Sequence, residues 1–287
     1  MGNLKGKDIL HGNQFSKKDI DAIIKIASNF EKELKKKDSL TLLKGKILAT
    51  LFYEPSTRTR LSFETAMQRL GGGVISMGSV ESSSVAKGET LTDTVRTVSQ
   101  YADVIVIRHP RTGSAREAAD AVPIPIINAG DGTGQHPTQA LLDIYTIKKE
   151  LGSLKNLTIS MVGDLKYGRT VHALVELLSL YETRLYFVSP HTLRIPEEIT
   201  SNLKQKGIEI EETEDMMKAA SASDLIYMTR IQKERFTDLS EYEKLKGSYI
   251  INEEFLKKLF GKAINHPPFP YLVYCLMNVL HSLSFRT

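Results

Sequence analysis

The chain has 287 residues, of which 41% are hydrophobic and 25% are charged. These fractions are close to average globular usage and argue against a disordered chain and against a membrane-embedded one. The 38 Lys and Arg residues against 34 Asp and Glu leave a net charge of +4, spread along the chain, which suits small anionic ligands better than nucleic acid.

The cysteine content and the lengths of the apolar runs exclude further classes of protein. The single cysteine, Cys275, allows no intramolecular disulfide and no zinc site built from several cysteines. Residues 1–10 hold no apolar run of signal-peptide length. The long apolar stretch Tyr271–Leu283 is shorter than the roughly 20 residues that a membrane-spanning helix needs. We therefore expect a cytoplasmic protein that binds neither membranes nor nucleic acid.

The first part of the chain alternates between helix-like and strand-like segments. Ser16 precedes apolar residues at helical spacing from Ile20 to Leu34, and the lysines at 35–37 suit the C-terminal end of a helix. Four short apolar runs follow, each succeeded by a helix-like stretch: Ile47–Phe52, Val74–Met77, Val104–Ile107 and Pro125–Ile127. Short buried strands that alternate with helices predict a parallel sheet in an α/β domain.

The same alternation restarts after a helix that is expected to end near Glu150. The strands expected in this second half are Leu157–Val162, Arg184–Val188, Gly207–Ile210 and Leu225–Met228. A glycine and a polar turn at Leu151–Ser153 indicate a hinge between the halves. The sequence therefore predicts two doubly wound parallel-sheet α/β domains joined by a hinge, residues 1–150 and 151–287.

In such sheets ligands bind beyond the carboxyl ends of the strands, so the loops after the strands are candidate sites. The loop after Phe52 reads Tyr-Glu-Pro-Ser-Thr-Arg-Thr-Arg and runs into a helical pattern. Backbone N–H groups at a helix N-terminus, hydroxyls and a guanidinium together form a phosphate cradle. The candidate residues are Ser56, Thr57, Arg58 and Thr59. One such residue alone would more simply cap the helix or stay solvated, but four donors in a row favour phosphate binding.

Two further loops add donors suited to a carbonyl group. Arg108 follows the strand Val104–Ile107, and His136 and Gln139 lie on either side of Pro137 at a helix start. A carbonyl under nucleophilic attack needs such donors aimed at its oxygen. A lone histidine in a loop is more often solvated or structural, but its place beside Gln139 at one helix end favours a site.

In the second half, arginines follow two of the expected strands. Arg169 comes after Leu157–Val162, and Arg230 comes after Leu225–Met228. Arginine binds carboxylates bidentately, so the two are candidate clamps for a dicarboxylic substrate, although surface ion pairs explain them equally well. The glycine-rich loop after Val162 also suggests a dinucleotide site, but it lacks the G-x-G-x-x-G spacing.

Four segments carry a resemblance to a known family, in content and in order: Tyr53-Glu-Pro-Ser-Thr-Arg-Thr-Arg60, Ser83-Ser-Val-Ala-Lys-Gly-Glu-Thr90, His136-Pro-Thr-Gln139 and Arg230-Ile-Gln232. They resemble the catalytic chains of aspartate carbamoyltransferases, archaeal ones above all, from about residue 3 to about residue 260. Ser-Thr-Arg-Thr and His-Pro-x-Gln also occur in ornithine carbamoyltransferases. The Lys-Gly-Glu-Thr and Arg-Ile-Gln segments favour aspartate.

The resemblance implies transfer of a carbamoyl group from carbamoyl phosphate to the amino group of L-aspartate, in pyrimidine biosynthesis, without a metal or an organic cofactor. Ser56, Thr57, Arg58 and Thr59 would bind the phosphate, and Arg108, His136 and Gln139 the carbamoyl end. Thr59, Arg108 and His136 would be catalytic because they polarise the carbonyl oxygen.

Aspartate would be bound by Lys87, Arg169, Arg230 and Gln232. In the family, Ser83 and Lys87 belong to a loop that reaches into the neighbouring subunit. The resemblance thus implies a homotrimer with shared active sites. A separate regulatory chain is left open.

The C-terminal end departs from the family pattern of His-Pro-Leu-Pro. Here His266-Pro-Pro-Phe-Pro places Pro268 and Phe269 where the family has a leucine and a proline. No Asp, Glu, Lys or Arg occurs between Asn265 and Ser284. A frameshift or a divergent gene model near residue 260 is the explanation we favour, and a genuine apolar helix over Tyr271–Leu283 is the other. The alternative functions are ornithine carbamoyltransferase or a catalytically impaired subunit that binds carbamoyl phosphate.

Overall fold

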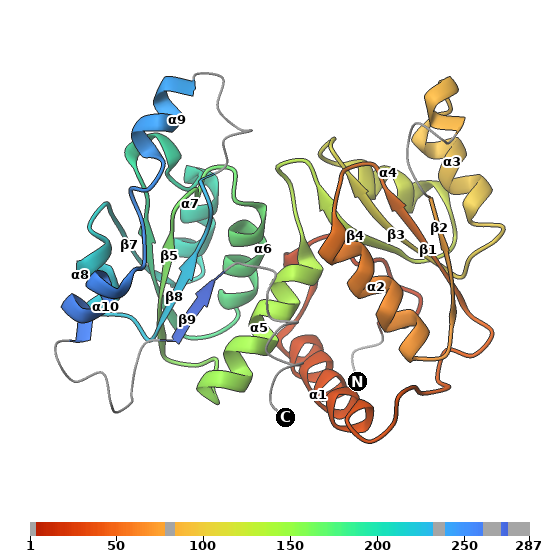
Figure 1. The fold of residues 1–287 in the computed structure, drawn as a ribbon, viewed down its shortest axis with the longest axis horizontal. Coiled ribbons are helices and arrows are strands. Elements are labelled where there is room, and N and C mark those ends of the chain that lie inside the picture. The colour runs from red at the N-terminus through yellow and green to blue at the C-terminus, as the bar shows by residue number, and fades with distance from the viewer. Residues whose placement is uncertain (1–3, 78–83, 232–238, 261–270, 275–287) are drawn as a thin grey trace. The chain divides into compact units, whose positions relative to one another are not determined.

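The computed structural model describes residues 4–77, 84–231, 239–260 and 271–274. The chain divides into two compact units between Tyr145 and Thr146, inside helix α5 (Pro137–Leu151). Each unit is a parallel sheet flanked by helices (Figure 1). The predicted class of two parallel-sheet α/β domains is thereby confirmed, whereas the hinge at 151–153 stays a prediction.

The N-terminal helix α1 (Lys17–Leu34) begins at a capping box, which follows the short helix η1 (Gly12–Gln14). The Ser16 hydroxyl accepts the Asp19 N–H at 3.3 Å, and the Asp19 carboxylate accepts the Ser16 N–H at 3.0 Å. Further along, Glu31 accepts a 2.5 Å hydrogen bond from the Tyr145 hydroxyl of α5. Burial and then the contact with Glu31 raise the pKa of Tyr145 to about 12, so this bond persists at neutral pH.

The sheet of the first unit has the order β2-β1-β3-β4, all parallel. Its strands are β1 (Ile47–Phe52), β2 (Gly73–Ser76), β3 (Val104–His109) and β4 (Ile126–Asp131). Side chains alternate between faces along β1 and β3, so the two core clusters of this unit lie on opposite faces. One contains Ala49 and Ile105, and the other contains Leu48 and Val106. The helices of this unit are α2 (Thr57–Arg69), η2 (Ser84–Lys87), α3 (Leu91–Val98) and α4 (Ser114–Ala121).

The sheet of the second unit has the order β7-β6-β5-β8-β9, again all parallel. Its strands are β5 (Leu157–Val162), β6 (Thr183–Val188), β7 (Glu209–Thr213), β8 (Leu225–Met228) and β9 (Tyr271–Tyr274). Its helices are α6 (Arg169–Leu178), η3 (His191–Leu193), α7 (Glu197–Gln205), α8 (Met216–Ser221), α9 (Leu239–Leu245) and α10 (Glu253–Phe260). In the described parts of both units, no helix has the length and apolarity to cross a membrane.

Matching aspartates align the strands at the amino ends of both sheets. Asp103 donates its N–H to the Ile47 carbonyl at 2.9 Å and accepts the Ile47 N–H on Oδ2 at 2.8 Å. In the second unit, Asp224 makes the same pair of bonds to Thr158, both at 2.8 Å. These bonds fix the register of β1 with β3 and of β5 with β8. The carboxyl ends of each strand pair therefore lie level.

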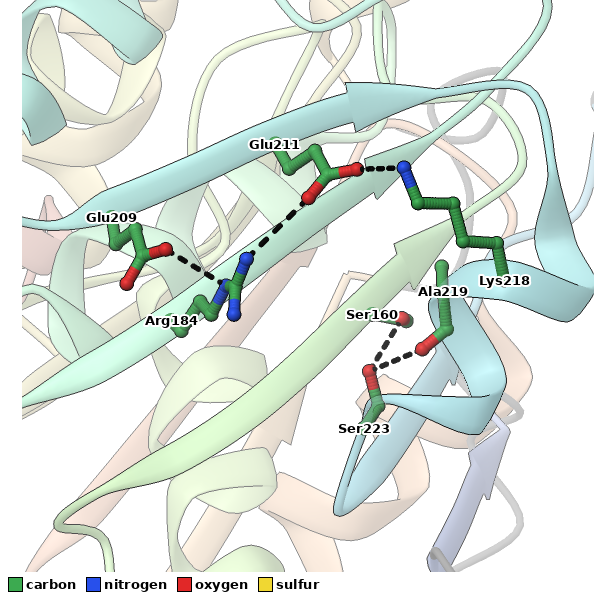
Figure 2. Close-up of polar contacts among 7 residues, drawn as sticks. All are labelled: Ser160, Arg184, Glu209, Glu211, Lys218, Ala219 and Ser223. Carbon is green, nitrogen blue, oxygen red and sulfur yellow. Dashed lines mark hydrogen bonds and ion pairs between the residues drawn. The ribbon is translucent and has the colours of Figure 1, made fainter.

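The edge strand β7 carries a charged network with its neighbours β6 and α8 (Figure 2). Arg184 of β6 lies between two carboxylates, with Nε 3.1 Å from Glu209 and Nη2 3.5 Å from Glu211. Lys218 of α8 contacts the other oxygen of Glu211 at 2.6 Å. Its hydrogen bond lowers the pKa of Glu211. Exposed charges along an edge strand discourage pairing with another chain.

The predicted strands Ile47–Phe52, Leu157–Val162 and Leu225–Met228 match β1, β5 and β8 residue for residue. The run expected at Gly207–Ile210 is instead a strand at Glu209–Thr213, because Gly207 has a φ of 79° and closes the turn after α7. The alternative explanation, an apolar helix over Tyr271–Leu283, is wrong for its first four residues. Tyr271–Tyr274 forms β9, since aromatic and β-branched residues favour strands and β8 offers an edge to pair with. The remainder, and the 266–270 loop, lie outside the described residues.

Removing the hydroxyl group from two buried serines should have opposite effects on thermal stability. Ser114 is fully buried, and its hydroxyl has no hydrogen-bond partner among the described residues. An unpaired buried hydroxyl costs about 1–3 kcal/mol, so Ser114→Ala should raise the thermal midpoint by a few degrees. In the matched control, the Ser223 hydroxyl bonds Ser160 at 2.7 Å and the Ala219 carbonyl at 2.9 Å (Figure 2). Ser223→Ala should therefore lower the midpoint, and calorimetry showing destabilisation by both changes would contradict the prediction.

Candidate active site

The expected phosphate cradle lies where β1 turns into α2. Tyr53 donates its N–H to the Arg108 carbonyl at 2.8 Å, which continues the β1–β3 pairing one residue past the strand. The chain then enters α2 at Thr57 with Ser56 as N-cap residue. The Ser56 side chain makes no capping bond, and its shielded hydroxyl has no hydrogen-bond partner among the described residues. Such a hydroxyl, beside the N–H groups of a first helical turn, is well suited to bind an anion.

The other cradle residues differ in exposure. Thr57 and Arg58 are exposed to solvent, whereas Thr59 is buried. Arg58 in the first turn places a positive charge where an anion can reach it from solvent. The loop thus combines helix N–H groups, hydroxyls and a cation within four consecutive residues.

Arg108 is held by two of the neighbouring strand ends. Its Nε donates to Glu54 Oε2 at 3.2 Å, and its Nη1 donates to the Ala129 carbonyl at 3.4 Å. Glu54 belongs to the loop after β1, and Ala129 belongs to β4. The guanidinium therefore has a defined orientation at the carboxyl end of the sheet.

His136 and Gln139 lie at the start of α5, and both are buried. The His136 carbonyl accepts the N–H groups of Gln139 at 3.1 Å and of Ala140 at 3.2 Å, so the histidine begins the helix. The Gln139 side chain donates from Nε2 to Asp143 at 2.9 Å, which fixes its amide. The Gln139 amide is therefore held by its own helix, whereas the bonds of His136 fix its backbone, and its ring lies with Nδ1 3.4 Å from the Thr138 hydroxyl.

Sequence reasoning missed several polar residues around these loops. Asp131, at the end of β4, is buried and bonded to the loop that leads to His136. Tyr53 packs its ring against His109, with centroids 4.7 Å apart. Burial, reinforced by nearby Arg111, lowers the pKa of His109, so its imidazole is neutral at pH 7. The available signal for Asp131 was its position between two glycines after a strand.

In the second unit, the loops that carry the arginines are joined at their base. Thr229 donates its N–H to the Val162 carbonyl at 2.7 Å and its hydroxyl to the same oxygen at 3.0 Å. Gly163 has a φ of 115°, and a Cβ there would lie 2.3 Å from the Thr229 carbonyl oxygen. Only glycine fits this approach. Half-buried Arg169 and exposed Arg230 extend from these two loops.

The loop before Arg169 is closed by two side chains. Asp164 Oδ1 accepts the Tyr167 N–H at 3.0 Å. His172, in the first turns of α6, lies with Nε2 2.8 Å from the Leu165 carbonyl. A carbonyl only accepts, so Nε2 is protonated and donates. Burial lowers the pKa of His172, although the bond to Leu165 opposes this shift.

The predicted site residues thus fall into two groups, each at the carboxyl end of one sheet. The group in the first unit is Ser56, Thr57, Arg58, Thr59, Arg108, His136 and Gln139. The second unit supplies Arg169 and Arg230. Lys87 ends η2 with its side chain exposed, whereas Ser83 and Gln232 lie outside the described residues. Within the described ranges no three His, Cys, Asp or Glu residues are grouped as metal ligands would be.

Two family models match the chain, one for each unit. Residues 7–149 match the model described as "Aspartate/ornithine carbamoyltransferase, carbamoyl-P binding domain". Residues 155–267 match "Aspartate/ornithine carbamoyltransferase, Asp/Orn binding domain".

Individual proteins are similar over most of the chain. The aspartate carbamoyltransferase catalytic subunit of Thermococcus kodakarensis is 57% identical over 253 residues, which cover 88% of this chain and 82% of the relative. The solved catalytic subunit of Methanocaldococcus jannaschii aspartate transcarbamoylase superposes with a TM-score of 0.82 at 51% identity, covering 93% of this chain and 84% of that one. The Trypanosoma cruzi enzyme in complex with carbamoyl phosphate and aspartate gives a TM-score of 0.87 at 41% identity, covering 94% and 85%.

His172 predicts a pH dependence of stability. Its folded pKa lies below the ordinary value of 6.5, so the folded state binds fewer protons than the unfolded state as pH falls past that value. Its contribution is complete above about pH 6.5 and is lost as pH falls through the folded pKa. His172→Gln keeps a donor but cannot titrate. Urea unfolding between pH 8 and pH 5 should show a shallower loss of stability in the variant, and identical slopes would refute this assignment.

Proposed function

The chain belongs to the aspartate/ornithine carbamoyltransferase family, and we infer from this membership and from its site that it is the catalytic chain of an aspartate carbamoyltransferase. It transfers the carbamoyl group of carbamoyl phosphate to the amino group of L-aspartate, giving N-carbamoyl-L-aspartate and phosphate. The observation that carries this conclusion is the 57% identity to a named aspartate carbamoyltransferase catalytic subunit over 88% of the chain. The same relatives favour aspartate over ornithine as acceptor.

The phosphate of carbamoyl phosphate binds at the start of α2. Ser56 offers a shielded hydroxyl, Thr57 and Thr59 offer two more, and the first-turn N–H groups point toward the same end of the helix. Arg58 supplies the positive charge, and each charge-assisted bond contributes about 1.5–3 kcal/mol. When the carbamoyl C–O bond breaks, the same groups stabilise the charge of the departing phosphate.

The carbamoyl carbonyl is polarised by Thr59, Arg108 and His136. Arg108 is oriented by Glu54 and Ala129, and the backbone of His136 is fixed at the start of α5, which limits how far either residue must move during the reaction. Preorganised donors to a developing oxyanion contribute about 10²–10³ in rate each. Gln139 binds the carbamoyl NH2 end.

Aspartate is bound by Arg169 and Arg230, with Lys87 and Gln232 as further ligands. The uncharged amine donates its lone pair to the carbamoyl carbon and a tetrahedral oxyanion forms. The C–O bond to phosphate then breaks, and the departing phosphate takes a proton from the new C–N nitrogen. This sequence needs neither a metal nor an organic cofactor. The cations offset the repulsion between two anionic substrates, which is the main cost of placing them together.

We further propose a cytoplasmic homotrimer that acts in pyrimidine biosynthesis. The support for shared active sites is the Ser83 to Lys87 segment, whose serine and lysine match a family loop that serves the neighbouring subunit. The support for the compartment is the single cysteine, which leaves no intramolecular disulfide. Association with a regulatory chain is compatible with this assignment, and no step of the reaction involves a membrane or nucleic acid.

The direct test is formation of carbamoyl aspartate by the purified chain, with ornithine in place of aspartate as the matched control. We expect turnover when aspartate is the acceptor and none when ornithine replaces it. A folded chain that binds carbamoyl phosphate but forms no product with either amine would instead support the impaired-subunit alternative. Activity with ornithine only would overturn the choice of acceptor.

Two arginine variants should separate the substrates. Arg58→Ala removes the cation of the phosphate cradle, so it should weaken inorganic phosphate binding about tenfold or more, as expected for a charge-assisted bond. Arg230→Ala should raise KM for aspartate and leave phosphate binding nearly unchanged. Arg184→Ala, in the surface network of β6, serves as the control and should change neither constant. Steady-state kinetics with phosphate as inhibitor gives both constants, and wild-type values in both site variants would sink the assignment.

A further inference from the structure

A buried carboxylate lies at the carboxyl end of β4. Asp131, the last residue of that strand, is 4% exposed, and both of its carboxylate oxygens accept hydrogen bonds from N–H groups. A charged group taken out of water costs several kcal/mol unless donors replace its hydration. The donors around Asp131 are therefore a condition for its burial.

The donors come from three separate parts of the first unit. Oδ1 accepts the backbone N–H of Gln135 at 2.9 Å and the side-chain amide of Asn128 at 3.0 Å. Oδ2 accepts the backbone N–H of Gly113 at 2.8 Å. One side chain thus joins the end of β4, the turn before α4, and the residue that precedes His136.

The side-chain amide of Asn128 is fixed in one orientation. Asn128 is fully buried, its Oδ1 accepts the Gly130 N–H at 2.8 Å, and its Nδ2 also donates to the Leu10 carbonyl at 3.1 Å. Flipping this amide would break both bonds. Asn128 therefore always presents a donor to Asp131, and an acceptor is required there.

The loop from Asp131 to Gln135 is also packed closely against its surroundings. Gly134 donates its N–H to the Asp131 carbonyl at 2.8 Å, and a Cβ on Gly134 would lie 2.8 Å from Asp131 Oδ1. Gly132 has a φ of 52°, and a Cβ there would lie 2.6 Å from Thr112 Oγ1. This leaves the loop little room to adopt a second conformation.

We propose that Asp131 is a positioning residue for carbamoyl transfer: its carboxylate sets the loop that presents His136 to the carbamoyl oxygen. Asp131 acts through the Gln135 N–H and does not itself contact substrate. The inference rests on the proposed function, in which His136 polarises the carbonyl. The phosphate cradle at Ser56–Thr59 lies on another loop, so loss of the Asp131 carboxylate affects the carbamoyl end and spares the phosphate end.

Asp131→Asn is the direct test because it keeps the size of the side chain. It replaces one carboxylate oxygen by an NH2 group, which then faces the N–H donors that the carboxylate accepted. Calorimetric titration should show carbamoyl phosphate binding about tenfold or more weaker, as expected for loss of hydrogen bonds to a charged group, while inorganic phosphate binding changes less than about twofold. At saturating aspartate, kcat/KM for carbamoyl phosphate should fall about 10–100-fold, the usual scale for groups that orient a site residue.

A second variant keeps the carboxylate and disturbs the same contact from the other side. Gly134 has no positive φ, so Gly134→Ala is resisted by contacts of its Cβ, which would lie 2.8 Å from Asp131 Oδ1, 3.0 Å from the Asp131 carbonyl oxygen and 3.1 Å from Thr112 Cγ2. It should lower carbamoyl phosphate affinity selectively, as Asp131→Asn does. The matched control is Asp19→Asn, since Asp19 also accepts a backbone N–H, from Ser16 at 3.0 Å, but in the capping box of α1. The control should lower the thermal midpoint and leave both affinities unchanged.

Equal weakening of carbamoyl phosphate and phosphate binding in Asp131→Asn and Gly134→Ala would show a general structural role and overturn the proposal. Unchanged affinities and kinetics in both variants would also overturn it. If the wild type binds carbamoyl phosphate but forms no carbamoyl aspartate, the proposed function fails, and the ratio of the two dissociation constants still decides the role of Asp131.

Discussion

The register of the parallel strands is the constraint on which the site depends. In both units an aspartate at the start of one strand makes a reciprocal pair of hydrogen bonds with the first strand of its sheet, Asp103 with Ile47 and Asp224 with Thr158. Because parallel strands rise equally per residue, alignment at the amino ends brings the carboxyl ends level. A slip of one residue would move each buried side chain to the opposite packed face of its sheet and separate the loops that carry the donors.

Positive charge and N–H groups gather where these strands end. Arg108 lies near the end of β3, Arg58 and His136 follow strands of the first sheet, and Arg169 and Arg230 follow strands of the second. Carboxylates at the same places orient these groups: Glu54 pairs with Arg108, and Asp131 holds the loop before His136. Under the proposed function, each unit binds its own anion through cationic groups on loops at the carboxyl ends of its strands. A rigid sheet supplies position, and the loops supply charge.

Much of this arrangement could be predicted from the sequence because it depends on local patterns. Apolar runs between polar turns locate β1, β5 and β8 to the residue, and the Ser-Thr-Arg-Thr segment lies at the strand-to-helix turn where the sequence places it. Asp131 escaped prediction because a glycine-rich turn does not reveal that Asn128 and Gln135 direct their donors at its carboxylate, and because its third donor, Gly113, is brought near only by the fold. The strand at Glu209–Thr213 was predicted two residues too early because Gly207 was counted as part of the strand, whereas it belongs to the turn that ends the preceding helix.

The contact at Gly163 limits how this fold can diverge. With a Cβ placed 2.3 Å from the Thr229 oxygen, every other residue at this position forces the loops after β5 and β8 apart. The backbone positions from which Arg169 and Arg230 extend therefore cannot shift by small steps during evolution. A descendant of this chain that used another amine would have to acquire that preference by exchanging side chains on an unchanged frame.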